Sequence, residues 1–211
     1  MNRLNKLPER TIERLSEYRR TLLSCLEKGK THIYSHELAN LHSITAVQVR
    51  RDIMLIGYST TLKKGYDVNA LIEVISHIID TEEGLNAAVI GIGNLGRAIT
   101  SYLNGKRTKL KIAASFDTDP EKANRIISGV KCYPMSELNQ IVKDLNISIG
   151  ILTVPPESAA LVAETLIMAG IKGILNYTST PLNITPTVFL EEYDMITSIE
   201  KVAYYVKQRN D

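Results

Sequence analysis

Residues 87–96 read Ala87-Ala88-Val89-Ile90-Gly91-Ile92-Gly93-Asn94-Leu95-Gly96, an apolar run that leads directly into a G-x-G-x-x-G loop, and residues 97–103 then have the spacing of a helix. The first glycine allows a tight turn, the second lets the backbone approach a pyrophosphate, and the third lets the helix pack closely on the strand. Free N–H groups at the start of a helix also favour a phosphate anion. This order of elements predicts a dinucleotide-binding site of the Rossmann type, with its phosphate loop at Gly91, Ile92, Gly93, Asn94, Leu95 and Gly96.

A second apolar run, residues 112–116, ends in Asp117, which follows Gly96 by 21 residues. In dinucleotide-binding domains a carboxylate at this distance accepts hydrogen bonds from the ribose hydroxyls of NAD(H) and repels the 2′-phosphate of NADP(H). The two signals together predict that the chain binds NADH or NAD+ and that Asp117 contacts the ribose.

The chain that follows alternates between extended apolar runs and helical segments. Strands are expected at residues 147–154 and 173–177, and helices after Asp119-Pro120 and after Ser136. This β-α-β alternation indicates a parallel sheet and an α/β domain. Because ligands bind beyond the C-terminal ends of the strands in such sheets, we expect four further residues beside the cofactor, namely Thr153, Val154, Pro155 and Asn176.

Composition and length exclude several classes of protein. The 211 residues are 44% hydrophobic and 23% charged, which suits two modest domains with real cores. There is no run of 18 apolar residues, and the first residues lack the apolar segment of a signal peptide, so we expect a cytoplasmic protein without a membrane span. Cys25 and Cys132 lack metal-ligand spacing, so we expect reduced thiols and no metal site.

Charge is distributed unevenly along the chain. Residues 1–66 contain 12 Lys and Arg against 6 Asp and Glu, whereas the remaining residues are slightly acidic. A basic module joined to a nucleotide-binding module indicates that the basic part binds a polyanion.

The basic segment has the pattern of a helix-turn-helix. A helix is expected over residues 8–26, and two shorter helices follow Ser35 and Thr45. Thr45 and Gln48 form a capping box, in which each side chain is expected to bond the backbone N–H of the other residue. A second helix of this kind presents Arg and Gln side chains to base edges in the major groove of DNA. We therefore expect four residues to contact DNA: Thr45, Gln48, Arg50 and Arg51.

Residues 58–66 alternate weakly between polar and apolar and contain a Lys-Lys-Gly turn. This pattern predicts a β-hairpin wing, in which Lys63 and Lys64 bind DNA phosphates. A connecting helix over residues 69–80 and a linker at residues 81–84 are expected to follow.

The last helix of the chain is expected to begin at Ser198, and it carries Ile199, Val202 and Val206 on one stripe. An exposed apolar helix needs a covering surface, either its own sheet or a partner subunit. A C2 homodimer is favoured because helix-turn-helix proteins usually present two recognition helices to an operator. The expected organisation is a winged-helix domain with its connecting helix over residues 1–80, a Rossmann domain over residues 85–197 and a dimerisation helix over residues 198–211.

These segments together resemble the Rex family of redox-sensing transcriptional repressors. The resemblance covers essentially the whole chain and rests on Gln48-Val49-Arg50-Arg51-Asp52, the glycine loop, Phe116-Asp117-Thr118-Asp119-Pro120, Leu152-Thr153-Val154-Pro155 and residues 169–176. It implies a homodimer with a swapped C-terminal helix, which binds double-stranded operator DNA when NADH is scarce and leaves it when NADH accumulates. By the same resemblance, Arg14, Tyr102 and Asp194 lie near the interface that moves.

The chain departs from the family pattern at two places. In the wing, Thr60, Leu62 and Lys63 stand where Gly, Arg and Gly are usual, and residues 176–179 read Asn-Tyr-Thr-Ser instead of Asn-Phe-Ala-Pro. We expect the first difference to affect DNA binding and the operator sequence, and the second to affect the pocket around the nicotinamide.

The residues alone leave two other functions open. A small NAD-dependent oxidoreductase needs a proton donor beside the nicotinamide, but all four His precede the glycine loop, and the Y-x-x-x-K pattern at Tyr102 ends the helix after it. A CoA-binding or nucleotide-binding regulatory module is the other alternative, and CoA would leave Asp117 without its ribose partner. We expect a repressor without catalytic residues.

Overall fold

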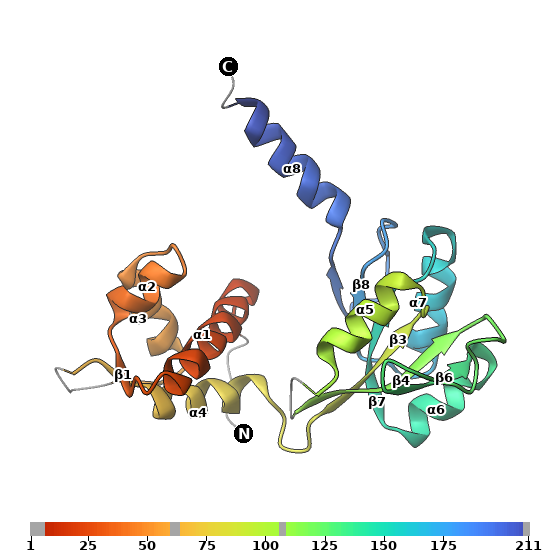
Figure 1. Cartoon of the computed structure of the whole chain (residues 1–211), viewed down its shortest axis with the longest axis horizontal. Helices are drawn as coiled ribbons and strands as arrows, with labels where there is room; N and C mark the ends of the chain where they lie inside the picture. The colour runs from red at the N-terminus through yellow and green to blue at the C-terminus, as the bar shows by residue number, and fades with distance from the viewer. Residues whose placement is uncertain (1–6, 60–63, 106–108, 209–211) are drawn as a thin grey trace. The chain divides into compact units, whose positions relative to one another are not determined.

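The computed structural model describes residues 7–59, 64–105 and 109–208. The chain folds into two compact units, Met1–Glu82 and Glu83–Asp211 (Figure 1). Each unit has its own hydrophobic core. No helix among the described residues has the length and apolar character that a membrane span requires.

The N-terminal unit is a helical bundle closed by a small sheet. Its elements are α1 (Glu9–Glu27), β1 (His32–Ile33), α2 (Ser35–Leu41), α3 (Ala46–Leu55), β2 (Tyr66–Asp67) and α4 (Val68–Ile79). The helices bury one apolar stripe each, and burying a large apolar side chain contributes about 1.5–3 kcal/mol. The fully buried members of this core include Leu15, Tyr18 and Leu22 of α1, Val49 and Ile53 of α3, and Leu71 and Ile75 of α4.

The predicted wing differs from a simple hairpin in the residues that the structure describes. Tyr66–Asp67 pairs antiparallel with His32–Ile33, whereas residues 58 and 59 are not in a strand. Gly65 permits this pairing, since a Cβ at that position would lie 2.6 Å from the carbonyl oxygen of Ile33. The turn residues Thr60, Leu62 and Lys63 lie outside the described residues.

A buried carboxylate joins α1 to α3. The side chain of Asp52 is fully buried and accepts hydrogen bonds from Arg14 Nε at 2.6 Å, Arg14 Nη2 at 2.8 Å, Tyr18 Oη at 2.9 Å and Gln48 Nε2 at 2.9 Å. Burial alone would raise the pKa of Asp52, but these hydrogen bonds outweigh it and lower that pKa. The carboxylate is therefore ionised at neutral pH and fixes α3 against α1.

The C-terminal unit is built on a seven-stranded sheet in the order β5-β6-β4-β3-β7-β8-β9, parallel except for the β5–β6 pair. The strands are β3 (Leu85–Ile90), β4 (Leu110–Asp117), β5 (Ile126–Ile127), β6 (Val130–Pro134), β7 (Ile147–Leu152), β8 (Gly173–Asn176) and β9 (Phe189–Glu192). The helices are α5 (Asn94–Leu103), α6 (Leu138–Asp144), α7 (Ala159–Met168) and α8 (Met195–Gln208).

The central strand β3 is buried on both faces, as expected for a doubly wound parallel sheet. Ala88 and Ile90 pack in one hydrophobic cluster with Leu138 of α6 and Leu166 of α7. Ala87 and Val89 pack in a second cluster, which includes Ile99 and Leu103 of α5. The two faces of the sheet are thus covered by different helices, α6 and α7 on one side and α5 on the other (Figure 1).

Two of the predicted helix starts are wrong. No helix follows Asp119-Pro120, because a single turn there ends at Asn124, whose φ is +61° and whose N–H donates to the carbonyl of Cys132 at 2.7 Å. Ser136 lies inside a 3-10 turn, Met135–Glu137, and does not cap α6.

The last helix also begins earlier than predicted, at Met195 rather than Ser198. Asp194 holds its start, since Oδ1 accepts from the Ile196 N–H at 2.9 Å and Oδ2 from the Thr197 hydroxyl at 2.6 Å. Those two hydrogen bonds lower the pKa of Asp194. A carboxylate is a good N-terminal cap because it also interacts favourably with the helix dipole.

Replacing Asp52 with Ala should lower the free energy of unfolding by about 2–4 kcal/mol, because the donors of Arg14 and Tyr18 lose their buried acceptor. Thermal unfolding followed by circular dichroism at pH 7 measures the loss, and Arg20→Ala, an exposed position on α1, the helix that carries Arg14 and Tyr18, is the control. Because the native pKa of Asp52 lies below its unfolded value of about 3.9, the stabilisation is present above that pH and is lost as the pH falls through the native pKa. Equal unfolding temperatures for wild type and Asp52→Ala at pH 7 would contradict this role.

Candidate functional site

The glycine loop connects β3 to α5, and the three glycines serve different purposes. Gly91 has φ +93°, and a Cβ there would lie 2.8 Å from the carbonyl oxygen of Thr153. At Gly96 a Cβ would lie 2.1 Å from the carbonyl oxygen of Gly91. Gly93 has an ordinary φ of −79°, and nothing lies within 4 Å of its Cβ position. The fold therefore requires the outer two glycines, whereas the middle one leaves open space beside the start of α5.

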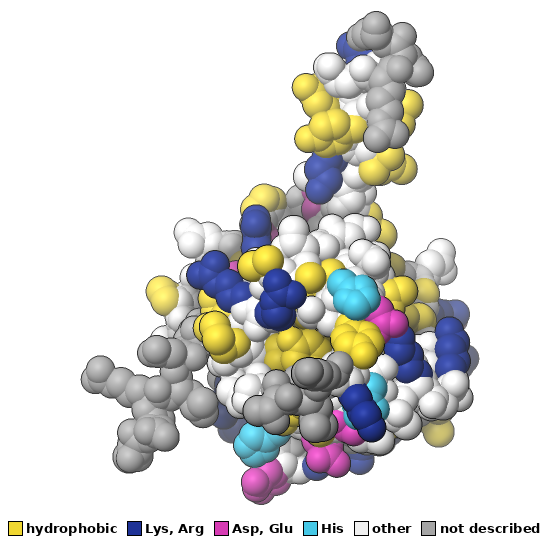
Figure 2. Space-filling view, turned by 90° about the vertical axis from the view of Figure 1, so that its left-hand side faces the viewer, with side chains coloured by type: hydrophobic (Ala, Val, Ile, Leu, Met, Phe, Trp, Pro, Cys, Tyr) yellow, Lys and Arg dark blue, Asp and Glu magenta, His cyan; other side chains and the backbone are white. Residues whose placement is uncertain are grey.

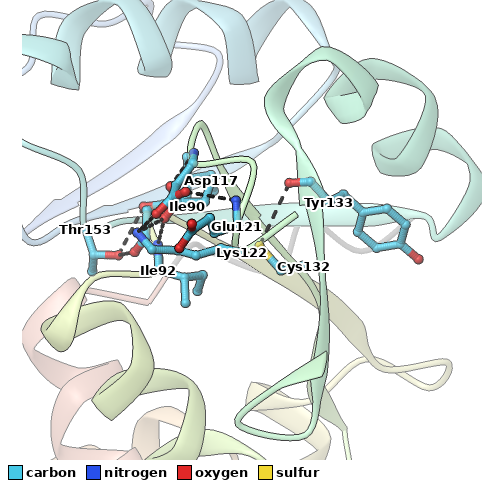
Figure 3. A network of polar contacts seen from close by, with 10 residues as sticks. Ile90, Ile92, Asp117, Glu121, Lys122, Cys132, Tyr133 and Thr153 are labelled. Atoms are coloured by element: carbon cyan, nitrogen blue, oxygen red, sulfur yellow. Dashed lines mark hydrogen bonds and ion pairs between the residues drawn. The ribbon is translucent and has the colours of Figure 1, made fainter. Parts of the chain in front are cut away.

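Thr153 holds this loop against the end of β7. Its N–H donates to the carbonyl of Ile90 at 2.9 Å, and its hydroxyl lies within hydrogen-bond distance of the carbonyls of Ile90 and Gly91, at 3.0 and 2.7 Å. The Thr153 side chain thus stabilises the turn from within the protein. Figure 3 shows this contact close to the carboxylate of Asp117.

Asp117 ends β4 and faces the loop (Figure 3). Its Oδ2 accepts from the Ile92 N–H at 2.8 Å and from Lys122 Nζ at 3.1 Å, and its Oδ1 accepts from the Asp119 N–H at 2.9 Å. Burial alone would raise the pKa of Asp117, but the hydrogen bonds from Asp119, Lys122 and Ile92 outweigh it and lower that pKa. The ionised carboxylate fixes the loop and leaves acceptor capacity toward the cleft.

A cleft of about 700 Å³ opens beside these residues. A cavity of this size suits a small-molecule or cofactor site. Six of the residues that were predicted to bind the cofactor line it: Gly91, Gly93, Asp117, Thr153, Val154 and Pro155. The predicted residues Ile92, Asn94, Leu95 and Gly96 belong to the loop and to the first turn of α5 but are not part of the cleft lining.

Several lining residues were not identified from the sequence. Lys122 reaches the cleft from the turn after β4, and Leu161 and Val162 reach it from α7. The spacing of Lys122 from Asp117 and Asp119 was visible in the sequence, but no role was assigned to this residue from the sequence. The sequence holds no signal that separates Leu161 and Val162 from the other apolar residues of α7, and only the structure shows that Leu161 is 69% exposed. The remaining lining residues that were missed are Ile90, Thr118, Asp119, Met135, Ser158 and Thr165.

Asn176 is buried and bonded within the protein. Its Nδ2 donates to the carbonyl of Thr180 at 2.9 Å, and its Oδ1 accepts from the Thr178 N–H at 3.0 Å and hydroxyl at 2.8 Å. These bonds order the chain that follows β8, in the segment where the sequence departs from the family pattern. Asn176 is outside the lining of the cleft.

The predicted DNA-contacting residues lie at the start and on the exposed side of α3. Thr45 caps the helix as predicted, its hydroxyl accepting from the Gln48 N–H at 3.1 Å. The reciprocal half of the capping box is wrong, since the Gln48 amide donates to Asp52. Arg50 donates to the hydroxyl of Ser35 on α2 at 3.1 Å, and Arg51 is exposed.

Figure 2 views the end of the N-terminal unit that carries α2 and α3. Lys and Arg side chains are spread over this face among hydrophobic and His side chains and do not form one continuous basic patch. Lys64 is exposed. This mixture of cationic, aromatic and apolar groups suits a surface that both holds phosphates and reads base edges.

The three residues expected near a moving interface lie on different elements. Arg14 is bonded to Asp52 within the N-terminal unit, Tyr102 is 65% exposed on α5, and Asp194 caps α8. All the described residues of α8 are exposed, including large apolar side chains such as Ile199, Val202 and Val206. Apolar surface of this extent on a helix indicates a protein-interaction face.

Two family models match separate parts of the chain. Residues 6–53 match a family described as putative DNA-binding protein N-terminus, and residues 82–180 match a family described as CoA binding domain. Among the described residues there is no group of three or more His, Cys, Asp or Glu side chains arranged to hold a metal ion.

The curated proteins and the solved structures that are similar to this chain both include Rex-family repressors. A redox-sensing transcriptional repressor Rex from Lactobacillus acidophilus is 34% identical over 206 residues, which cover 98% of each chain. A crystal structure of RSP, a Rex-family repressor, in complex with beta-NAD+ and operator DNA has a TM-score of 0.88 at 29% identity, covering 97% of this chain and 94% of that one. RSP in complex with beta-NADH has a TM-score of 0.84 at 28% identity, covering 98% and 97%.

Replacing Gly93 with Val should weaken NADH binding at least about 30-fold, close to 2 kcal/mol, because the side chain would enter the open space of the cleft without disturbing the loop. Isothermal titration with NADH measures the loss, and an unchanged unfolding temperature shows that the fold is intact. The matched variant Gly96→Ala should instead lower the free energy of unfolding by about 2–4 kcal/mol, since its Cβ meets backbone. Unchanged NADH affinity in Gly93→Val would exclude this loop from the binding site.

Proposed function

The chain belongs to the Rex family of redox-sensing transcriptional repressors, and we propose that the cleft at Gly93 and Asp117 is its NADH-binding site. We also propose that α3 is the helix that reads the operator. The protein represses transcription by binding operator DNA as a homodimer and is released when NADH binds. The observation that supports this function best is that one chain joins a helix-turn-helix unit to a Rossmann sheet, with Rex relatives aligned over nearly its full length. Rex proteins are repressors rather than enzymes, and we assign no catalytic residue.

The cleft suits a dinucleotide with NAD(H) chemistry. We propose that backbone N–H groups of the loop, residues 91–96, bind the pyrophosphate, which the open side of Gly93 and the N-terminus of α5 favour. Asp117 is ionised and has acceptor capacity for ribose hydroxyls. Thr153 positions the loop, and Val154 and Pro155 supply the apolar wall. When bound, the dinucleotide supplies the redox signal, since its nicotinamide is either reduced or oxidised.

Asn176 has a different role in this proposal from direct contact with the cofactor. Its internal hydrogen bonds to Thr178 and Thr180 hold the segment after β8, so we assign it to positioning the chain between β8 and β9. We propose that CoA is not the preferred ligand, although the family model that matches residues 82–180 carries that description. The support is Asp117, whose carboxylate suits the free ribose hydroxyls of NAD(H).

On the DNA side, we propose that α3 enters the major groove. Asp52 orients the Gln48 amide and Ser35 orients the guanidinium of Arg50, so two of the four polar side chains are held before DNA binds. Arg51 projects from the helix face opposite Val49 and Ile53 and is the best candidate for bidentate contact with guanine. We assign Lys64, with Lys63 beside it in the chain, to phosphate contacts.

The homodimer accounts for the uncovered helix. We propose that α8 packs on the partner subunit through the face that carries Ile199, Val202 and Val206, and that Arg14, Tyr102 and Asp194 lie close to the interface so formed. A repressor that binds operator DNA acts inside the cell, and we propose the cytoplasm as its compartment.

The replacement of Arg51 with Ala should cost about 1–3 kcal/mol of operator binding and relax the preference at one base pair. Lys64→Ala should instead weaken binding to all sequences alike and reduce the salt slope by about one. Fluorescence anisotropy with operator and scrambled duplexes at several salt concentrations separates the two effects. A uniform loss with Arg51→Ala would remove that residue from base reading.

NADH and operator should weaken each other by one common factor, because the two ligands favour different states of the dimer. The expected factor is about 5–150, the range of common allosteric couplings. It is measured as NADH affinity with and without saturating operator, and again as operator affinity with and without NADH, with NAD+ as the control ligand. Equal NADH affinities in the presence and absence of operator would refute the sensor function even if both ligands bind.

A further inference from the structure

Lys122 is placed between two carboxylates at the edge of the cleft. Its Nζ lies 3.1 Å from Oδ2 of Asp117 (Figure 3) and 3.5 Å from Oδ2 of Asp119, and all three residues line the cleft. Lys122 is attached to the short turn after β4, where Asp119 Oδ1 accepts from the Glu121 N–H at 2.9 Å. The cluster of two carboxylates and one ammonium has a net charge of −1.

The hydrogen bonds of Asp117 show which of its partners can leave. An ionised carboxylate offers about four lone-pair sites, and the protein uses three of them, through Ile92 N–H, Asp119 N–H and Lys122 Nζ. Two ribose hydroxyls need two sites, so one present donor must give way. The two N–H donors are fixed in the backbone, whereas the ammonium is at the end of a flexible four-carbon chain. Lys122 is therefore the donor that ribose hydroxyls displace.

Asp119 determines where the displaced ammonium goes. Its carboxylate already lies 3.5 Å from Nζ, and a short movement of the Lys122 side chain converts this contact into the main ion pair. Without Asp119, an ammonium displaced from Asp117 beside the ribose would be available to a 2′-phosphate, for which Lys is a common partner. With Asp119 present, the positive charge remains neutralised and the cluster keeps its net negative charge.

We propose that Asp119 and Lys122 are specificity-determining residues of the ribose site, where Asp119 retains the Lys122 ammonium and so makes the cleft select NAD(H) over NADP(H). The inference rests on the proposed function of the cleft and extends it beyond Asp117. It assigns the discrimination to a three-residue cluster instead of to one carboxylate.

The direct test is Asp119→Asn in the full-length protein, titrated calorimetrically with NADH and with NADPH. Asn keeps a side-chain oxygen for the Glu121 N–H, so the turn is preserved and only the charge is removed. NADPH affinity relative to NADH should rise about tenfold, because the Lys122 ammonium, no longer retained by Asp119, becomes available for a charge-assisted contact with the 2′-phosphate. Glu121→Gln is the matched control, because it removes one negative charge two residues further along the chain, from a side chain that does not line the cleft. It should leave the ratio of NADPH to NADH affinity unchanged.

A double-mutant cycle tests the part assigned to Lys122. In the Lys122→Met background, Asp119→Asn should raise the NADPH to NADH affinity ratio by less than about twofold, because the ammonium that would bind the 2′-phosphate is absent. An unchanged ratio in Asp119→Asn that still binds NADH overturns the proposal, and so does an equal gain in the Lys122→Met background. Failure of the wild-type protein to bind NADH would instead overturn the proposed function of the cleft, and this inference with it.

Discussion

The close approach of α5 to β3 is the constraint on which the C-terminal unit depends. At Gly96 the helix backbone lies so near the carbonyl of Gly91 that a Cβ would be 2.1 Å from that oxygen. Because the helix starts this close to the strand, its N-terminal N–H groups face the C-terminal edge of the sheet, where Asp117 and Thr153 also arrive. Loop, carboxylate and threonine then hold each other by hydrogen bonds that need no ligand. The cleft is thus formed before anything binds, which reduces the entropy cost of binding.

The N-terminal unit depends on a second constraint of the same kind, the buried carboxylate of Asp52. An ionised group without solvent is tolerated only when its hydrogen bonds are satisfied, and Arg14, Tyr18 and Gln48 satisfy it from two helices. This arrangement fixes the recognition helix against α1 while its opposite side remains exposed.

The sequence predicted the parts of the fold that rest on local backbone rules. Glycine spacing, the Thr45 cap and the apolar runs of β3, β4, β7 and β8 have physical causes within a few residues, and the structure confirms these elements. The Gln48 amide was paired with Thr45 instead of Asp52, its neighbour four residues on in the same helix, because the burial of that carboxylate against α1 could not be read from the local sequence. The helix predicted at Pro120 failed because Asn124 adopts a left-handed conformation to meet Cys132, a partner that only the folded sheet brings near. Lys122 was missed although Asp117 and Asp119 are close to it in sequence, because the turn that brings its ammonium to both carboxylates was predicted as a helix.

A ladder of backbone hydrogen bonds runs along the C-terminal edge of the sheet and joins the cleft to the start of α8. Gly91 N–H donates to Phe116, Thr153 to Ile90, Tyr177 to Leu152 and Tyr193 to Asn176, at 2.8 to 3.0 Å. The rings of Tyr177 and Tyr193 are also in contact, with centroids 5.3 Å apart. A continuous ladder of this kind is rigid and has no second arrangement of its own, so it can transmit a change in the cleft but cannot act as the switch. An element that changes between two states must therefore lie at a surface that is not packed within one chain. α8 begins two residues after the ladder ends, and all its described residues are exposed. If NADH binds at the cleft and α8 forms the subunit interface, as proposed, the rigid edge of the sheet connects the two sites directly.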